Sequence, residues 1–347
     1  MGIKQLSVIL KEHCKKGVKE KQVGSFAFKK VAIDISNFIY QFLIAVRSGG
    51  SALGYGDTTT SHLVGMFYRT IRIVESGVTP IFVFDGKPPE LKLYELKKRS
   101  DRRDKAEEQL KLAMEAEDKA EIEKQTKRKI KVSEEHVNDC KRLLKLMGIP
   151  YLTAPSEAEA FCAYLCKVKC VDAVATEDMD ALPFGAPVLL RGFSSAAVKK
   201  THVTEYNLQT CLGELDMNLP EFIDLCILLG CDYTKSGKGI GPKKGVSLIK
   251  KYKCIEKIFE HEKMELSPNF EYQKAREIFN ELSNIPVETN VSEFTIKWDD
   301  INLEEVKKFL VTEKAFDEKR VINGIKLLKS CRNKSKQTSL DKFLRKK

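Results

Sequence analysis

Acidic residues follow apolar runs at several separate places along the chain. Asp34 comes directly after residues 31–33, and Asp85 comes directly after residues 81–84. Such runs are typical of buried strands, and the carboxyl ends of parallel strands meet at one edge of an open α/β sheet. The acids that we expect at this edge, or at a helix end beside it, are Asp34, Asp85, Glu157, Glu159, Asp178, Asp180 and Asp232.

These seven carboxylates would repel one another strongly unless cations lay among them. Hard divalent cations such as Mg²⁺ prefer oxygen ligands and keep part of their water shell. Two such ions can activate a water molecule and stabilise the leaving oxygen of a phosphodiester. Each acid taken alone also fits a helix cap or a turn, as Asp85 before Gly86 illustrates. The whole set predicts a site for hard divalent metals.

The composition places this acidic set within a basic protein. Sixty Lys and Arg against 49 Asp and Glu give a net charge of +11 over 347 residues. A basic surface attracts polyanions such as nucleic acid, although a charge of this size also serves solubility alone. No apolar run approaches the ~18 residues of a membrane helix, so we expect no membrane partner. The ten cysteines include no C-x-x-C pair, which favours buried free thiols over zinc ligands.

Alternating strand-like and helical patterns over residues 1–90 and 132–252 predict an α/β fold with a mixed, largely parallel central sheet. Residues 91–131 are charge-dense and lack Gly and Pro, which predicts a helical insertion. That insertion is either a solvated hairpin or a bridge over the site whose cations face nucleic acid. Ser156 is expected to cap the helix after it, and the Lys- and Ser-rich segment from Ser330 is expected to lack regular structure.

A glycine-rich turn at residues 237–241 opens a helix at Pro242. Exposed backbone N–H groups at such a turn hold phosphate. It is not a nucleotide P-loop, because neither Ser nor Thr follows Lys243. A hairpin between two helices that grips a DNA backbone fits better, and a plain turn is the alternative.

Seven blocks of the chain resemble the structure-specific 5′ nuclease superfamily, most closely the eukaryotic flap endonucleases. They are residues 1–3, 31–34, 40–47, 83–89, 154–160, 175–180 and 228–233. The resemblance implies a 5′-flap endonuclease with 5′–3′ exonuclease activity in DNA replication (Okazaki fragment maturation) and repair. The alternatives are a 5′–3′ exonuclease at nicks and gaps, or a non-catalytic binder of DNA junctions. It further implies a monomer in the nucleus, with a mitochondrial pool as an extension.

The resemblance also implies roles for individual residues. The seven carboxylates would hold two Mg²⁺, which Mn²⁺ can replace. Lys92 and Arg99 would stabilise the scissile phosphate, and Tyr40 would stack on a base. A K⁺ ion would assist the helix–turn–helix element. The implied contacts with branched DNA are Gly2, Arg47, Arg69, Glu157, Gly230, Asp232, Gly239, Gly241, Lys243 and Lys244. The implied contacts with a trimeric sliding clamp are Gln337, Leu340, Phe343 and Leu344.

Two features depart from the family pattern. The 51–60 loop carries a single acid, Asp57, where the family often has several, so the resemblance does not extend to contact with a 3′ flap. Phe343-Leu344 replaces a pair of aromatics, which should weaken docking on the clamp. The expected organisation is an N-terminal nuclease region (1–103), a helical arch (91–131), an internal nuclease region with the helix–hairpin element (121–252), a C-terminal helical region (253–330) and a flexible tail (331–347).

Overall fold

The computed structural model describes residues 2–337 except 4, 46–53, 56–57, 194, 196–201, 238, 263–269 and 284–295. The predictions for Arg47, Asp57, Leu340, Phe343 and Leu344 therefore lie outside the described residues. Within the described part of the chain, no helix combines the length and the apolarity needed to span a membrane.

Seven strands form one sheet in the order β1-β9-β8-β7-β2-β5-β6. The five strands from β8 to β6 are parallel, whereas β9 is antiparallel to both β8 and β1. The expected mixed, largely parallel sheet is confirmed. The strands are β1 Val18–Gln22, β2 Lys30–Asp34, β5 Thr79–Phe84, β6 Tyr151–Thr153, β7 Ala173–Ala175, β8 Val188–Arg191 and β9 His202–Asn207. A separate pair joins β3 Gly54–Tyr55 to β4 Thr58–Thr59.

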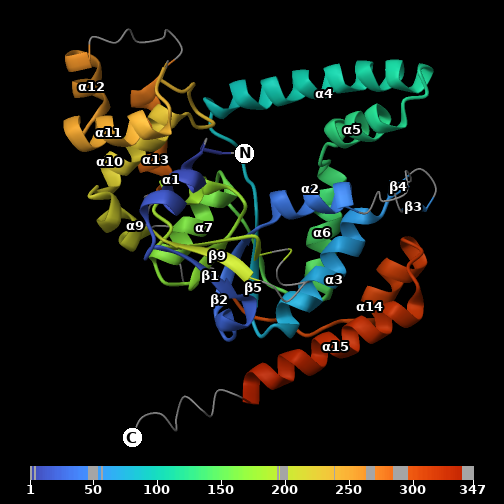
Figure 1. Cartoon of the computed structure of the whole chain (residues 1–347). Helices are drawn as coiled ribbons and strands as arrows, with labels where there is room; N and C mark the ends of the chain where they lie inside the picture. Colours follow the sequence, from blue (N-terminus) through green and yellow to red (C-terminus); the bar gives the residue numbers. More distant parts are fainter. Residues whose placement is uncertain are drawn as a thin grey trace, which may run out of the picture.

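Successive side chains of the central strands enter opposite layers of the core. In β5, Ile81 and Val83 join one hydrophobic cluster and Phe82 and Phe84 the other, as the period of two residues in a strand requires. Two layers of helices therefore enclose the sheet (Figure 1). The first comprises α1 Leu6–His13, α7 Ala158–Lys167, α9 Leu208–Leu215, α10 Leu219–Leu229, α11 Pro242–Tyr252, α12 Ile255–Glu262 and α13 Tyr272–Ser283. The second comprises α2 Ile35–Ala45, α3 Ser61–Glu75, α6 Glu134–Leu146, α14 Leu303–Lys307 and α15 Glu318–Gln337.

The strand order defines where a ligand site can form. From β2 the chain crosses to β5 and then to β6 on one side of the sheet, and it returns to β7 on the other side of β2. The switch point therefore lies between β2 and β7. In open α/β sheets, ligands bind in the crevice outside the carboxyl ends of the strands at such a point. Asp34 is the last residue of β2.

The insertion between β5 and α6 is a helical hairpin, as predicted. It consists of α4 (Lys92–Glu115) and α5 (Lys119–Lys129). In Figure 1, α4 extends along the top of the molecule and α5 returns beneath it. Ala106, Leu110 and Ala113 are the buried side chains of α4, and the buried Gln125 of α5 donates to Gln109 Oε1 at 2.8 Å. These contacts keep the two helices together as one arch.

The C-terminal helix α15 continues to Gln337, so the expectation of irregular structure from Ser330 is wrong over residues 330–337. Val321, Ile325 and Leu328 attach this helix to the core. Residues 325–337 contain no Gly or Pro, so nothing local ends the helix there. Arg332 further fixes it by donating to the Asp299 carbonyl at 2.7 Å.

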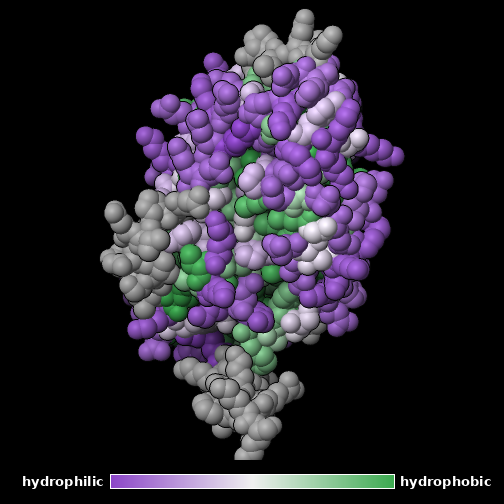
Figure 2. Space-filling view, turned by 90° about the vertical axis from the view of Figure 1, so that its left-hand side faces the viewer, coloured by the Kyte–Doolittle hydropathy of each residue, from purple (hydrophilic) through white to green (hydrophobic). Residues whose placement is uncertain are grey.

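The molecular surface on the side of α9 to α13 is covered mainly by hydrophilic side chains, with apolar ones gathered in a hollow near its middle (Figure 2). Helix α11 is the most evident example of this two-sided pattern. Val246, Leu248 and Ile249 are buried, whereas Lys250 and Lys251 are exposed. This helix follows the glycine-rich turn, so its charged face continues the surface that the turn begins.

Candidate metal and DNA site

Asp34 lies at the centre of the site and is 1% exposed. Its Oδ1 accepts a hydrogen bond from Ser36 N at 3.0 Å. Its Oδ2 accepts from Asn37 Nδ2 at 3.2 Å and from Thr176 Oγ1 at 3.0 Å. Ser36 and Asn37 belong to α2, and Thr176 follows β7. The two elements that flank the switch point therefore fix the orientation of this carboxylate.

Asp85 follows β5 and connects α2 to α7. Its Oδ1 accepts from Ala158 N at 2.9 Å, and its Oδ2 accepts from Ser36 Oγ. The expected cap by Ser156 is wrong, because α7 begins one residue later than that prediction required. Glu157 occupies the N-cap position, and Ser156 Oγ donates to the Lys87 carbonyl at 3.0 Å instead. Asp85 therefore accepts the hydrogen bond from the first backbone N–H of α7, and its side chain is still exposed at the site.

Asp178 and Asp180 follow β7 and are 8% and 6% exposed. Ile3 N donates to Asp180 Oδ1 at 2.8 Å, which attaches the N-terminal segment to the site. A Cβ on Gly2 would overlap the carboxylates of both aspartates, and the φ of Gly2 is +76°. Only glycine fits at this close approach. The sequence gives no local signal for this packing.

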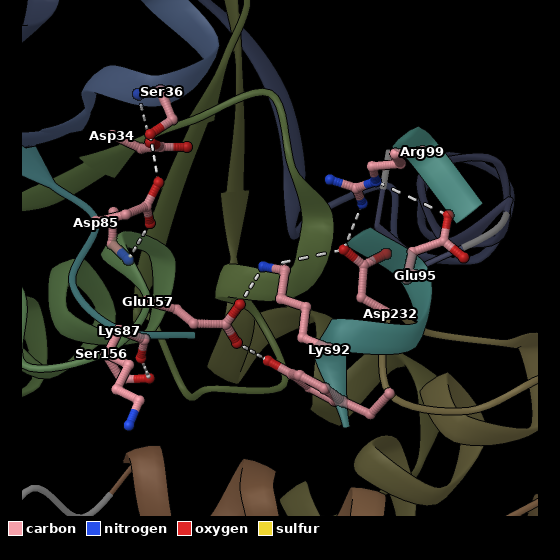
Figure 3. A network of polar contacts seen from close by, with 12 residues as sticks. Asp34, Ser36, Asp85, Lys87, Lys92, Glu95, Arg99, Ser156, Glu157 and Asp232 are labelled. Carbon is pink, nitrogen blue, oxygen red and sulfur yellow. Dashed lines mark hydrogen bonds and ion pairs between the residues drawn. The ribbon is translucent and has the colours of Figure 1, made fainter. Parts of the chain in front are cut away.

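Two cations from the base of α4 reach the carboxylates, as Figure 3 shows. Lys92 Nζ donates to Glu157 Oε1 and lies 3.9 Å from Asp232 Oδ2. Arg99 Nη2 donates to Asp232 Oδ2 at 2.6 Å. Although burial opposes its charge, the neighbouring Glu159 and Glu157 raise the pKa of Lys92 above its usual value. The ion pairs place both α4 cations at the edge of the sheet.

Tyr233 is a site residue that the sequence reasoning missed. Its hydroxyl donates to Glu157 Oε2, and the side chain is 5% exposed. Tyr233 directly follows Asp232, and this position beside an expected ligand is the sequence feature that could have identified it as a site residue. Its hydrogen bond fixes the carboxylate of Glu157 on the side away from Lys92.

Burial controls the ionisation of the carboxylates. It raises the pKa of Asp34 to about 7, and the charge of Asp85 adds to this shift. Burial likewise raises the pKa of Glu159, Asp178 and Asp180. Carboxylates in this environment ionise readily only when positive charge is close, and an all-oxygen donor set suits Mg²⁺. The residues therefore fit a divalent cation chemically.

Within the described residues, no three His, Cys, Asp or Glu side chains converge closely enough to hold an ion as they stand. The cations Lys92 and Arg99 contact Glu157 and Asp232 instead. The ligand assignment of the seven carboxylates thus remains a prediction of the sequence. The structure brings these residues to one edge of the sheet by their elements, and Figure 3 labels Asp34, Asp85, Glu157 and Asp232 among them.

A cavity of about 860 Å³ lies between the carboxylates and the arch. Asp34, Asp85, Glu157, Glu159 and Asp178 form its acidic wall. Its basic wall comes from the arch and the segment after it, through Lys92, Arg99, Arg102, Arg103, Lys105, Arg128 and Lys131. The insertion therefore shares a cavity with the carboxylates, as its interpretation as a bridge over the site requires, and that its cations face nucleic acid stays a prediction. A second cavity of about 980 Å³ lies on the other side of α4 and includes Gly2, Gly230 and Asp232.

The remaining predicted residues lie at different distances from the carboxylates. Tyr40 lines the first cavity. Arg69 of α3 packs its guanidinium 4.6 Å from the centre of the Phe42 ring and donates to Gln41 at 3.3 Å, so its side chain is held against α2. Gly230, with a φ of +98°, ends α10 and precedes Asp232.

The glycine-rich turn has the predicted form. Gly239 has a φ of +75°, and Gly241 is the N-cap of α11. Lys243 and Lys244 are exposed in the first turn of that helix. Lys243 also borders a cavity of about 630 Å³ that Lys250 and Lys251 share. The turn therefore opens a basic surface, as a backbone-binding element requires.

Comparison with known proteins gives matches over nearly the whole chain. Two family models match, the XPG N-terminal domain over residues 1–106 and the XPG I-region over residues 148–232. Flap endonuclease 1 of Encephalitozoon cuniculi (strain GB-M1) is 53% identical over 344 residues, which cover 99% of each chain. The flap endonuclease-1 structure from Methanococcus jannaschii is 34% identical with a TM-score of 0.70, covering 91% of this chain and 97% of that one. The catalytic core of Rad2 in complex with DNA substrate is 25% identical with a TM-score of 0.66, covering 94% of this chain and 100% of that one.

Acidic and basic walls that face each other across one cavity suit an enzyme that brings a phosphodiester to metal ions. The fold and the site thus define the class as the structure-specific nucleases. The identity of 53% over almost the full length is decisive for the particular family. The chain belongs to the flap endonuclease 1 family, which confirms the resemblance seen in its motifs.

Proposed function

We propose that the seven carboxylates hold two Mg²⁺ ions and that the scissile phosphate of a 5′ flap is seated between these ions and the base of α4. The observation that carries the proposal is the cavity beneath the arch, with five of the acids on one wall and the basic residues of the arch on the other. A phosphate can approach such acids only if cations lie between them. The raised pKa values of the buried acids support the same need for positive charge.

The activity follows from the family. The chain is a Mg²⁺-dependent, structure-specific flap endonuclease of DNA replication and repair. When bound, two such ions supply Lewis-acid stabilisation to the attacking and leaving oxygens of the phosphodiester. The 5′–3′ exonuclease activity uses the same residues on a shorter 5′ end.

The chain's own residues bind and orient the strand. Lys92 and Arg99 neutralise the phosphate, for which they exchange their present partners Glu157 and Asp232. The ring of Tyr40 stacks on a nucleobase in the first cavity. Since α4 carries both cations on one face, movement of the arch couples their release from the carboxylates to entry of DNA.

The helix–turn–helix element grips the duplex. Gly239 and Gly241 would let the DNA backbone approach, and a K⁺ ion held at this turn would add positive charge for a phosphate. Lys243 and Lys244 supply the adjacent charges. Gly2 and Gly230 contact the branch point through the second cavity, which they both line. Arg47 and Arg69 belong to the contacts with the duplex on the other side.

The remaining proposals concern partners and location. Gln337 ends α15, and with Leu340, Phe343 and Leu344 it forms the segment that docks on a trimeric sliding clamp. The protein acts as a monomer, mainly in the nucleus, with a mitochondrial pool. Mn²⁺ replaces Mg²⁺ in the site, because it accepts the same oxygen ligands.

Substitution of one expected ligand tests the metal assignment. Asp178→Ala should abolish cleavage of a 5′-flap duplex while the Kd for that duplex stays near the wild-type value. Asp172→Ala is the matched control, because this exposed residue directly precedes β7, at the opposite end of the same strand. Cleavage by the Asp178 variant at close to the wild-type rate would contradict its role as a ligand.

A further inference from the structure

Tyr94 is the most exposed of the described Phe, Tyr and Trp side chains, with 61% of its surface accessible. It lies in the first turn of α4, close to Lys92. The Nζ of Lys235 lies 5.9 Å from the centre of its ring. Nothing in the site described above assigns a role to this ring, although it lines the second cavity.

The first turns of α4 present two different faces. Lys92, Arg99 and Arg103 follow one another at helical spacing and line the first cavity, beneath the arch. Tyr94 and Lys98 lie four residues apart on the other face and line the second cavity. The helix base therefore separates two cavities and contributes to both.

The two cavities meet at the carboxylates. Arg99 and Arg102 line both of them. Asp178 faces the first cavity and Asp232 the second. A strand whose phosphate is seated at the carboxylates therefore extends into the first cavity on one side and into the second on the other. Tyr40 lines the first cavity. Tyr94 and Tyr233 line the second, but Tyr233 is 5% exposed and bonded to Glu157, so Tyr94 is the ring that such a strand can reach there.

The second cavity adjoins the element that is proposed above to grip the duplex. Residues 230–236 line it, and they lead directly into the glycine-rich turn at residues 237–241. With a volume of about 980 Å³, it is large enough for a nucleotide and its neighbours. Lys98 and Lys235 add positive charge beside the ring, as a surface that follows a nucleic-acid backbone requires.

We propose that Tyr94 is a second base-stacking platform, which receives the first nucleobase on the 3′ side of the scissile phosphate. This inference rests on the proposed seating of that phosphate at the carboxylates. Tyr40 and Tyr94 then hold the nucleotides on either side of the bond in different cavities. The two bases are kept apart, and the phosphate between them is pressed towards the acids. Tyr94 acts as a positioning residue, because it touches the strand beside the reacting atoms.

The test measures single-turnover cleavage of a 5′-flap duplex at saturating protein. Tyr94→Ala should slow cleavage about tenfold, the order expected for loss of one base–aromatic stacking interaction. Tyr94→Phe should restore the rate to near the wild-type value, since the ring is kept. Leu112→Ala is the control, because Leu112 lies on the same helix and is 64% exposed. A normal rate for Tyr94→Ala, or a Phe variant as slow as the Ala variant, would overturn the proposal.

A spectroscopic measurement tests the placement. 2-Aminopurine is placed at the first nucleotide 3′ of the scissile bond or, in a second substrate, at the first nucleotide 5′ of it. Fluorescence is read with Ca²⁺, which also takes oxygen ligands, in place of Mg²⁺, under conditions in which no product forms. Loss of the Tyr94 ring should raise the emission of the 3′ probe only, because stacking quenches the probe. A rise confined to the 5′ probe, or no change in either, would refute the placement.

The wild-type protein separates this inference from the function on which it rests. If the wild type cleaves the flap and Tyr94→Ala cleaves it equally well, the stacking platform is wrong and the nuclease function stands. If the wild type releases no product with Mg²⁺, the seating of the phosphate at the carboxylates is wrong, and the platform is wrong with it.

Discussion

Replacing Asp34 by Asn should stabilise the protein when divalent cations are removed. Asp34 is 1% exposed, and burial together with the charge of Asp85 raises its pKa from 3.8 to about 7. A pKa shift of about three units means that ionisation of Asp34 lowers the free energy of unfolding by about 4 kcal/mol at neutral pH. The substitution removes this charge and keeps the size of the side chain.

The hydrogen bonds of Asp34 reduce the gain. Ser36 N donates to Oδ1 of Asp34, and the amide oxygen of the Asn variant can accept the same hydrogen bond. Asn37 Nδ2 and Thr176 Oγ1 both donate to Oδ2, where the amide would present an N–H group. Rearranging these donors costs about 1–2 kcal/mol. The variant should therefore be about 2 kcal/mol more stable than the wild type at about pH 8.

The sign of the pH dependence follows from the raised pKa. Because the folded protein holds this proton more tightly than the unfolded chain, the loss of stability begins near the ordinary carboxyl pKa and is complete above about pH 7. At about pH 3 the carboxyl is mostly protonated in both states, so the advantage of the variant should disappear. Urea denaturation in EDTA at these two pH values measures the difference.

Mg²⁺ should reverse the order of stability of the wild type and Asp34→Asn. An ion that binds only the folded protein stabilises it by mass action, and the wild type offers one more carboxylate ligand than the variant. In millimolar Mg²⁺ the wild type should therefore gain more stability than Asp34→Asn. The reasoning is refuted if the variant is less stable than the wild type in EDTA at about pH 8, or if Mg²⁺ stabilises the two proteins equally.

Three further predictions concern the arch, the N-terminal segment and the C-terminal segment. Lys92→Ala should slow a pre-bound single turnover far more than it weakens binding, because its ammonium serves the phosphate; a binding defect alone would contradict this role. Gly2→Ala should lower both the cleavage rate and the apparent affinity for Mg²⁺, since a Cβ there overlaps the carboxylate of Asp180. Cleavage rates measured across a Mg²⁺ titration test this, and an unchanged rate and affinity would show that the contact is unimportant. Deleting residues 338–347 leaves α15 intact and should remove stimulation by the sliding clamp without changing basal cleavage; equal stimulation of the shortened chain would show that docking lies elsewhere.

The central features of the fold could be predicted because they depend on local patterns. The apolar runs before Asp34, Asp85 and Asp178 form parallel strands, and parallel strands bring their carboxyl ends to one edge. The charged insertion forms two helices because residues 91–131 lack Gly and Pro. In each case a single property, such as strand hydrophobicity or helix propensity, was sufficient.

The features that escaped prediction depend on contacts between distant segments. Strand β1 (Val18–Gln22) is polar and pairs at the sheet edge with β9, so no hydrophobic pattern marks it. The hydrogen bond from Tyr233 to Glu157 joins residues 76 positions apart. The packing of Gly2 against Asp180 depends on how the N-terminal segment crosses the site. Such contacts are set by tertiary packing, which local propensity does not specify.

The most direct test of the account is cleavage of two labelled substrates, a 5′-flap duplex and the matching nicked duplex, with and without Mg²⁺. The account predicts release of the intact flap that depends on Mg²⁺ and exceeds any loss of nucleotides from the nick. Stepwise loss from the nick as the main reaction would identify an exonuclease. Absence of product from both substrates at every Mg²⁺ concentration would contradict the claim that the carboxylates and the arch together form a nuclease site.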